Sequence, residues 1–494
     1  MGKLNHMIAE SLSFDVLVIG SGPAGQNAAL EAADRGARVL IIEQEPNVGG
    51  ACVQYGTIPS KTLRETALTL TAFQRRSGDV YRVSHDAQLS ITSLMKRLNE
   101  VVHAHQETTR QCLQRAGVER AYGRARFQSP SEVVITRVSG EQTIVTGSSI
   151  VIATGSRPRN PANVRVDHEN ILDSDSILSM SYLPTSILVF GGGVIACEYA
   201  STFASLGVRV TMIDRASRPL SFVEAELTDF FLQQLAVNGG TFHGGCELAS
   251  VKWDGVSSVR AVLADGRSFQ ADKAFVALGR VANIDTLGIE LVGLTASERG
   301  LLTVNEFCQT AVPHIYAVGD TIGPPALASA SMDQGRRAAI HAMTGIPSYG
   351  KSALPTGIYT IPEIATVGMT EQEAIKEFGQ PMVARVRYDQ VARAHIMATS
   401  AGMLKLIADP EGRRILGVQV AGDGATELVH LGQLALIAEL PVDTFIQTTF
   451  NFPTMAEAYR LAALEIVHAR EKQSLRIGRF GHSYARTSLA EVAQ

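Results

Sequence analysis

The chain has 494 residues, of which 45% are hydrophobic and 19% charged, and its formal net charge is −4. This length predicts about two to four domains with large apolar cores, and the small net charge, without a long Lys/Arg run, argues against a nucleic-acid or membrane-surface partner. Because the chain has no signal-peptide pattern, no long apolar span and only five widely spaced cysteines, we expect a cytoplasmic protein.

A strand–turn–helix–strand unit opens the chain. Residues 14–19 (FDVLVI) form an apolar run that predicts a buried parallel strand. The turn GSGPAG follows, and its three glycines are Gly20, Gly22 and Gly25. The first allows a tight turn, the second lets the backbone approach a pyrophosphate, and the third lets helix and strand pack closely. The next strand ends at Glu43, which is placed to accept hydrogen bonds from an adenosine ribose.

The same unit recurs further along the chain. Residues 187–190 (ILVF) lead into the turn GGGVIA, a helical segment, and a strand at residues 208–213. Asp214 ends that strand, 23 residues after the first glycine of its turn, and this offset equals the one between Gly20 and Glu43. A single glycine motif is weak evidence because ordinary turns also collect glycine, but two copies in matched context are strong evidence for two dinucleotide sites.

The charged residues after each acid distinguish the two sites. Glu43 and Glu45 would repel a 2′-phosphate, so the first site suits FAD or NAD. Asp214 at the second site favours a free 2′-hydroxyl, whereas Arg215 and Arg218 can pair with a 2′-phosphate. This mixture predicts a site that accepts both NAD and NADP. A solvated charged loop with plain NAD specificity is the alternative.

Four segments resemble the pyridine nucleotide–disulfide oxidoreductases. Residues 49–61 (GGACVQYGTIPSK) resemble the family's redox segment, and ATG at 153–155, ALGR at 277–280 and YAVGD at 316–320 follow in the family's order. The resemblance extends over roughly residues 14–467, nearly the whole chain. It implies FAD as cofactor, NAD(H) and NADP(H) as substrates, and a homodimer.

The chain departs from this family where disulfide chemistry occurs. Disulfide-reducing members have a second cysteine five positions after the first, but here Cys52 is followed at that position by Thr57. Their C-terminal HPT-x-x-E segment carries a proton-handling His, whereas this chain reads NFPTMAE with Phe452 in its place. A hydroxyl cannot form a disulfide and a phenyl ring cannot transfer a proton. We therefore expect Cys52 to be a packing residue rather than a lone redox thiol.

Without the dithiol, the resemblance implies hydride transfer between NADPH and NAD+, or NADH and NADP+, through FAD in ping-pong order, which is transhydrogenation. Lys61 and Glu198 resemble the family's Lys–Glu ion pair beside the flavin and are expected to be catalytic. A FAD-dependent NAD(P)H reductase (diaphorase) for quinone or oxygen is one alternative. The other is a non-catalytic nucleotide-binding flavoprotein, which would not require such a pair.

The motifs and the resemblance together define the expected ligand contacts. The residues expected to contact FAD are Gly20, Gly22, Pro23, Ala24, Gly25, Glu43, Gly50, Ala51, Cys52, Thr57, Lys61, Ala153, Thr154, Gly155, Gly319 and Asp320. Those expected to contact NAD(P) are Gly191, Gly193, Val194, Ile195, Glu198, Asp214, Arg215, Arg218 and Gly279. No metal is expected, since His103 and His105 are two apart on a predicted helix and face different directions.

The predicted fold class is α/β, with two Rossmann-like dinucleotide-binding domains and a C-terminal α+β dimerisation domain. The expected division is an N-terminal extension (1–13), an FAD-binding domain in two parts (14–158 and 284–354), an inserted NAD(P)-binding domain (159–283), an interface domain (355–468) and a C-terminal extension (469–494). Residues 60–117 are expected to hold two helical stretches. In the second, Cys112 is expected in the core with Leu94, Leu98 and Val101.

Overall fold

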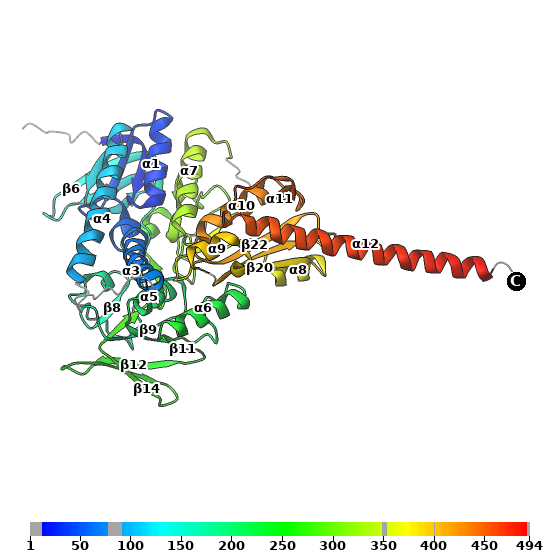
Figure 1. Ribbon diagram of the computed structural model, residues 1–494. Coiled ribbons are helices and arrows are strands. Elements are labelled where there is room, and N and C mark those ends of the chain that lie inside the picture. Colours follow the sequence, from blue (N-terminus) through cyan, green and yellow to red (C-terminus); the bar gives the residue numbers. More distant parts are fainter. Residues whose placement is uncertain (1–11, 78–90, 348–352, 400, 492–494) are drawn as a thin grey trace, which may run out of the picture.

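The computed structural model describes residues 12–77, 91–347, 353–399 and 401–491. Three sheets with their helices make up most of the molecule (Figure 1). Within the described ranges, no helix is long and apolar enough to cross a membrane.

The first sheet is built from strands that are far apart in the sequence. Its order is β3 (Glu119–Tyr122), β2 (Val39–Glu43), β1 (Leu12–Ile19), β6 (Gln142–Ile152), β5 (Glu132–Thr136) and β4 (Arg124–Ser129), and β17 (Ile315–Ala317) pairs with β6. The inner strands β1, β2, β6 and β17 are parallel, and their apolar runs are buried because helices cover the sheet. Strands from both sides of the second nucleotide motif therefore share one sheet.

The helices of this unit cover the sheet or pack on one another. They are α1 (Pro23–Asp34), α2 (Gly50–Gln54), α3 (Thr57–Ser77), α4 (Ile91–Arg115), α7 (Ala328–Thr344) and the short η3 (Gly319–Thr321) and η2 (Ile289–Val292). Helices α1 and α7 touch at Gly335, where an added Cβ would lie 2.1 Å from the carbonyl oxygen of Ala24. The two helical stretches expected within residues 60–117 correspond to α3 and α4.

The second glycine turn belongs to a separate parallel sheet. Its order is β11 (Thr241–His243), β10 (Arg209–Ile213), β9 (Ser186–Phe190), β15 (Lys273–Val276) and β8 (Ile171–Asp173), and it carries α5 (Val194–Ser205), α6 (Ala225–Val237) and η1 (Ile177–Ser179). All five residues of β9 are buried, which explains its continuous apolar sequence. An antiparallel sheet of β12 (Leu248–Trp253), β13 (Val259–Leu263) and β14 (Ser268–Ala271) adjoins it.

The two chain segments that connect these two units run side by side. Strand β7 (Ser156–Pro158) leaves the first sheet, β16 (Arg280–Ala282) returns to it, and the two pair antiparallel. This two-stranded ribbon therefore connects the units next to the ATG and ALG turns.

The C-terminal region forms an antiparallel sheet covered by helices. Its order is β18 (Thr356–Ile358), β19 (Ile364–Gly368), β22 (Ile415–Gly422), β21 (Gly402–Ala408) and β20 (Met382–Arg387). The helices are α8 (Glu371–Phe378), η4 (Tyr388–Gln390), α9 (Ala392–Met397), α10 (Ala425–Ile437), α11 (Thr444–Gln447) and α12 (Glu457–Glu491). Helix α12 projects from the body of the molecule, and residues 469–491 of the predicted C-terminal extension form its outer part (Figure 1).

One prediction about the core of α4 is wrong. Cys112 is exposed, whereas its neighbour Leu113 is fully buried and Leu98 is 5% exposed. The buried stripe runs through Leu98, Thr109 and Leu113, so Cys112 lies one position away from it. The side chain of Leu94 and the predicted extension up to residue 11 lie outside the described residues. The domain boundaries proposed from the sequence remain predictions.

Candidate functional site

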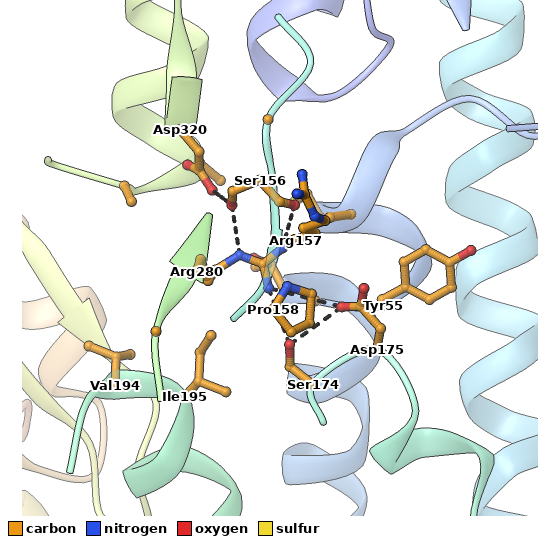
Figure 2. A pocket seen from close by; sticks show the side chains of 18 of the residues that line it. Tyr55, Ser156, Arg157, Pro158, Ser174, Asp175, Val194, Ile195, Arg280 and Asp320 are labelled. Atoms are coloured by element: carbon orange, nitrogen blue, oxygen red, sulfur yellow. Dashed lines mark hydrogen bonds and ion pairs between the residues drawn. The ribbon is translucent and has the colours of Figure 1, made fainter. Parts of the chain in front are cut away.

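A large cavity of about 1380 Å³ lies where the three sheets meet. Both glycine turns line it, together with α2, the start of α3 and residues of the C-terminal region, including Pro355, Gly357 and Tyr359. Single-ligand pockets usually measure about 300–1000 Å³, so this cavity has room for more than one ligand. Figure 2 shows the part of the cavity between the two nucleotide motifs.

The first glycine turn has the geometry of a pyrophosphate cradle. Gly20 has a φ of +104°, and a Cβ on Gly25 would lie 2.0 Å from the carbonyl oxygen of Gly20, so only glycine fits at either position. A Cβ on Gly22 would meet nothing within 4 Å beyond its chain neighbours. Gly22 is also the N-cap of α1 and no side chain caps that end. The backbone N–H groups at this helix start are therefore available to an anion.

Two polar side chains near this turn support the fit of FAD. Glu43 Oε2 accepts hydrogen bonds from Ser21 N (2.8 Å) and Ser21 Oγ (2.6 Å), which fixes the carboxylate at the cavity wall. Thr154 Oγ1 is buried, lines the same cavity and has no hydrogen-bond partner. A buried hydroxyl without a partner is costly, so a polar group of a bound ligand would satisfy it.

The second glycine turn repeats the geometry of the first. Gly191 has a φ of +116°, and Gly193 has nothing within 4 Å of an added Cβ. Asp214 lies on the cavity wall and accepts a hydrogen bond from Ala216 N at 2.5 Å. Arg215 also lines the cavity. This turn therefore offers one acidic side chain, Asp214, and one cationic side chain, Arg215, near the expected adenosine ribose.

Arg218 lies elsewhere. It does not line the cavity, and its guanidinium pairs with both carboxylate oxygens of Asp229 on α6. Arg218 also donates to Thr228 Oγ1 at 3.2 Å, so its guanidinium is held against α6 rather than at the cavity wall. The pairing with a 2′-phosphate predicted for Arg218 is not supported by this position, which leaves Arg215.

Lys61 and Glu198 meet across two units of the structure. Lys61 lies on α3 and Glu198 on α5, and their Nζ and Oε2 atoms are 2.7 Å apart. The two side chains are 24% and 9% exposed, so the pair is largely shielded from water. The backbone N–H of Tyr359 donates to the other carboxylate oxygen of Glu198 at 2.9 Å. The arrangement places a fixed, poorly solvated ammonium on the wall between the two glycine turns.

Cys52 has a hydroxyl as its neighbour in place of a second thiol. Its side chain hydrogen-bonds that of Thr57, and burial raises the pKa of its thiol, although this hydrogen bond and the charge of Lys61 oppose the rise. All five cysteines are free. Phe452 is 67% exposed and does not line the cavity. A thiol that is protonated at neutral pH and lacks a partner cannot act as a dithiol relay.

A chain of polar contacts runs across the β7–β16 ribbon, from Asp320 to Ser174 and Asp175 (Figure 2). Arg280 donates to Ser156 Oγ at 2.7 Å and to its carbonyl oxygen at 2.6 Å. Ser156 Oγ donates in turn to Asp320 Oδ2 at 2.5 Å. On its other side, Arg280 lies 3.2 Å from Ser174 Oγ and 4.0 Å from Asp175. The contacts thus connect Asp320, which is expected to contact FAD, to Ser174 and Asp175 on another part of the cavity wall.

A group of three acidic side chains away from the cavity is paired with two cations. The carboxylates of Glu224, Glu226 and Glu371 lie within 4.8 Å of one another. Lys405 forms ion pairs with all three, and Arg385 pairs with two of them. Lys405 and Arg385 lie on strands of the C-terminal sheet, so these ion pairs link that sheet to the start of α6.

The structure brings nearly all predicted site residues to one cavity. Of those assigned to FAD, only Gly25 does not line it, and its tight contact with Gly20 matches the packing role proposed for it. Of those assigned to NAD(P), only Arg218 does not line it. Sequence reasoning missed Tyr359 and Ser156. Tyr359 is 161 positions from Glu198, and no sequence motif reports a contact over that distance.

Comparison with known proteins links these features to one family. The family model described as pyridine nucleotide-disulphide oxidoreductase matches residues 14–335, and that of its dimerisation domain matches residues 354–463. A soluble pyridine nucleotide transhydrogenase from Mycobacterium tuberculosis (strain ATCC 25177 / H37Ra) is 42% identical over 462 residues, covering 92% of this chain and 97% of its own. One from Marinomonas sp. (strain MWYL1) is 40% identical over 460 residues, covering 91% and 97%.

Solved structures show the same architecture. LpdA from Mycobacterium tuberculosis has a TM-score of 0.85 and 26% identity, covering 92% of this chain and 99% of its own. The Cu(II) complex of the HOCl-induced flavoprotein disulfide reductase RclA from Escherichia coli has a TM-score of 0.83 and 25% identity, covering 91% and 99%. With the family models, these matches confirm the predicted fold class.

Proposed function

Because the chain belongs to the pyridine nucleotide-disulphide oxidoreductase family, we propose that it is a FAD-dependent transhydrogenase that moves hydride between NADPH and NAD+, or between NADH and NADP+. One observation carries the proposal. A cavity with two dinucleotide turns contains the Lys61–Glu198 pair, while Cys52 faces Thr57 where a dithiol would need a second cysteine.

FAD, when bound, supplies the group that accepts hydride from one nicotinamide and returns it to another. The protein supplies alignment and charge. The start of α1 and Thr154 are suited to hold the dinucleotide part of FAD, and Lys61 stands near the junction of both sites. Glu198 keeps the Lys61 ammonium in place, so the charge is oriented before a nicotinamide arrives.

The second site is proposed to accept both nicotinamide nucleotides. Asp214 is suited to the 2′-hydroxyl of NAD(H), and Arg215 to the 2′-phosphate of NADP(H). Both must use this one site in turn, because the first glycine turn is taken by FAD. Ping-pong order follows from this arrangement.

The proposed assembly is a homodimer that acts in the cytoplasm without a metal ion. The match to a dimerisation domain over residues 354–463 supports self-association. Five free cysteines suit a reducing compartment. The acidic group at Glu224 holds Lys405, which supports the proposal that it needs no metal.

The test is a direct assay of hydride transfer. The purified yellow protein is mixed with NADPH and an NAD+ analogue whose reduced form absorbs at a distinct wavelength. Rapid reduction of the analogue is the expected result. Flavin that NADPH reduces but only a quinone or oxygen reoxidises would replace the proposal with a diaphorase. Flavin that no nicotinamide reduces would point to a non-catalytic flavoprotein, and measurable lipoamide or glutathione-disulfide reduction would refute the argument from Cys52 and Thr57.

A further inference from the structure

One segment of the C-terminal region is wedged between the two nucleotide-binding units. Residues 359–363 follow β18 and contact helix α5 of the second unit on one side. There, the N–H of Tyr359 donates to Glu198 Oε1 (2.9 Å) and the N–H of Ile361 donates to Ser201 Oγ (3.0 Å). Ser201 is fully buried, so this contact is protected from competing water.

The same segment is tied to helix α3 of the first unit. Arg64, 3% exposed, donates from Nε to the carbonyl oxygen of Thr360 (3.1 Å) and from Nη2 to Glu363 Oε1 (2.9 Å). Glu363 also accepts hydrogen bonds from the backbone N–H and the hydroxyl of Thr426 on α10, at 3.0 and 2.7 Å. The segment is therefore held by all three units and has little freedom to move.

The ring of Tyr359 faces the ammonium of Lys61. The Nζ atom lies 5.0 Å from the ring centroid, inside the limit of about 6 Å for a cation–π contact. Since the ring also lines the cavity and Lys61 is 24% exposed, the contact is partly shielded from water. Lys61 thus has two anchors, the Glu198 carboxylate and the Tyr359 ring. Glu198 in turn is held by Lys61 at one oxygen and by the Tyr359 N–H at the other.

We infer that Tyr359 is a positioning residue for hydride transfer, through which the interface domain sets the place of the Lys61 ammonium. Lys61 and Glu198 belong to two units joined by the β7–β16 ribbon, and Tyr359 is the residue that touches both. The inference rests on the proposed function, because it requires Lys61 to act at the flavin. Tyr359 does not exchange a proton or an electron. It acts through Lys61.

The test measures flavin reduction by NADPH in the FAD-loaded protein, using stopped-flow absorbance at several NADPH concentrations. Tyr359→Leu is expected to lower the limiting rate roughly tenfold, the scale of a partly desolvated cation–π contact, with an unchanged Kd for NADPH. Tyr359→Phe keeps the ring and should retain at least half of the rate. Tyr182→Leu is the matched control, because Tyr182 faces Lys273 at 4.5 Å outside the cavity lining.

A double-mutant cycle separates this inference from the proposed function. In a Lys61→Met background, Tyr359→Leu should cause no further loss, because the ammonium on which the ring acts is gone. If Lys61→Met alone leaves flavin reduction unchanged, the role proposed for Lys61 fails. If Lys61→Met slows it but Tyr359→Leu does not, or if Tyr359→Phe is as slow as Tyr359→Leu, the positioning role alone is overturned. A Tyr359→Leu loss that persists in the Lys61→Met background overturns it as well.

Discussion

Lys405→Met removes a buried ammonium at the junction of the NAD(P)-binding unit and the C-terminal sheet. The side chain is 2% exposed and pairs with Glu224, whose own side chain is 7% exposed. Its Nζ also lies 3.2 Å from Glu226 and 2.5 Å from Glu371. Glu224 and Glu226 belong to the start of α6, whereas Lys405 lies on β21. Methionine preserves most of the side-chain volume, so the substitution removes the charge with little change in packing.

The expected loss of stability follows from the carboxylates left behind. Removing one partner of a buried ion pair costs about 3–5 kcal/mol. Arg385 remains 3.0 Å from Glu226 and 2.5 Å from Glu371, so those two acids keep a cation. Glu224 keeps only neutral donors, including Gln419 Nε2 at 2.8 Å. We therefore expect a loss near the lower limit, which corresponds to a fall in the melting temperature on the order of 10 °C.

The cluster also predicts a dependence of stability on pH. Burial works against ionisation of Glu371, but Lys405 and Arg385 outweigh it and lower the pKa of this carboxyl. The Glu371 carboxylate therefore stabilises the fold fully above pH 4.5, its ordinary pKa, and this stabilisation is lost as the pH falls through the lowered pKa. Burial likewise disfavours the Lys405 ammonium, but the glutamates outweigh it and raise the pKa. The Lys405 ammonium therefore stabilises the fold fully below pH 10.5, and this stabilisation is lost as the pH rises through the raised pKa. Lys405→Met should abolish this loss of stability at alkaline pH.

The protein contains a single tryptophan, Trp253 in β12, which reports on the NAD(P)-binding unit. Thermal unfolding followed by its fluorescence should show the full shift in Lys405→Met, and release of flavin fluorescence a smaller one. Adding Glu224→Gln should restore part of the stability by removing the uncompensated charge. Arg387→Met serves as control, because its side chain is 74% exposed and its ion pair contributes less than about 1 kcal/mol. A Trp253 transition that moves no more in Lys405→Met than in the control would refute this reasoning.

Three further predictions concern the cavity. Gly25→Ala should prevent FAD retention, because the new Cβ would collide with the carbonyl oxygen of Gly20. Gly22→Ala has room for its Cβ, so this variant should fold and only bind the dinucleotide more weakly. Flavin content and melting curves distinguish the two outcomes. Arg215→Ala should raise the KM for NADPH about tenfold or more with little effect on NADH, as expected for a lost charge-assisted phosphate contact, whereas Arg218→Ala should leave the ratio unchanged. Equal effects on both nucleotides would contradict this. At pH 8, iodoacetamide should label exposed Cys112 before Cys52, Cys197 and Cys308, because burial raises the pKa of those three thiols. Peptide mass spectrometry gives the order of labelling, and earlier labelling of any of the three would contradict this.

Local sequence was sufficient for the features that depend on a few neighbouring residues. Each glycine turn needs a positive φ or a close backbone approach at one position, and only glycine meets that need, so the turns at Gly20 and Gly191 were readable from their spacing. The acids Glu43 and Asp214 follow from the length of the unit. The missing dithiol was likewise visible, since Thr57 stands five positions after Cys52.

Apart from the Lys61–Glu198 pair, which the family resemblance implied, contacts between distant segments were beyond the reach of the sequence. Arg218 looked like a phosphate ligand beside Asp214, but Asp229 on α6 captures its guanidinium. Cys112 matched an apolar stripe, yet the direction in which α4 packs leaves it exposed. Helical periodicity alone can misplace the buried face of a helix by one residue, and only packing against another element decides which face is buried.

The sequence by itself therefore determined the two nucleotide motifs and the lack of a second cysteine five positions after Cys52. The tertiary structure alone decided which further side chains surround the expected Lys61–Glu198 pair, Tyr359 among them. Lys61, Glu198 and Tyr359 come from three units and meet within a few ångströms. The physical reason is that turns and helix starts are specified by backbone geometry over a few residues, whereas the position of an ammonium depends on which side chains the packed domains bring to it.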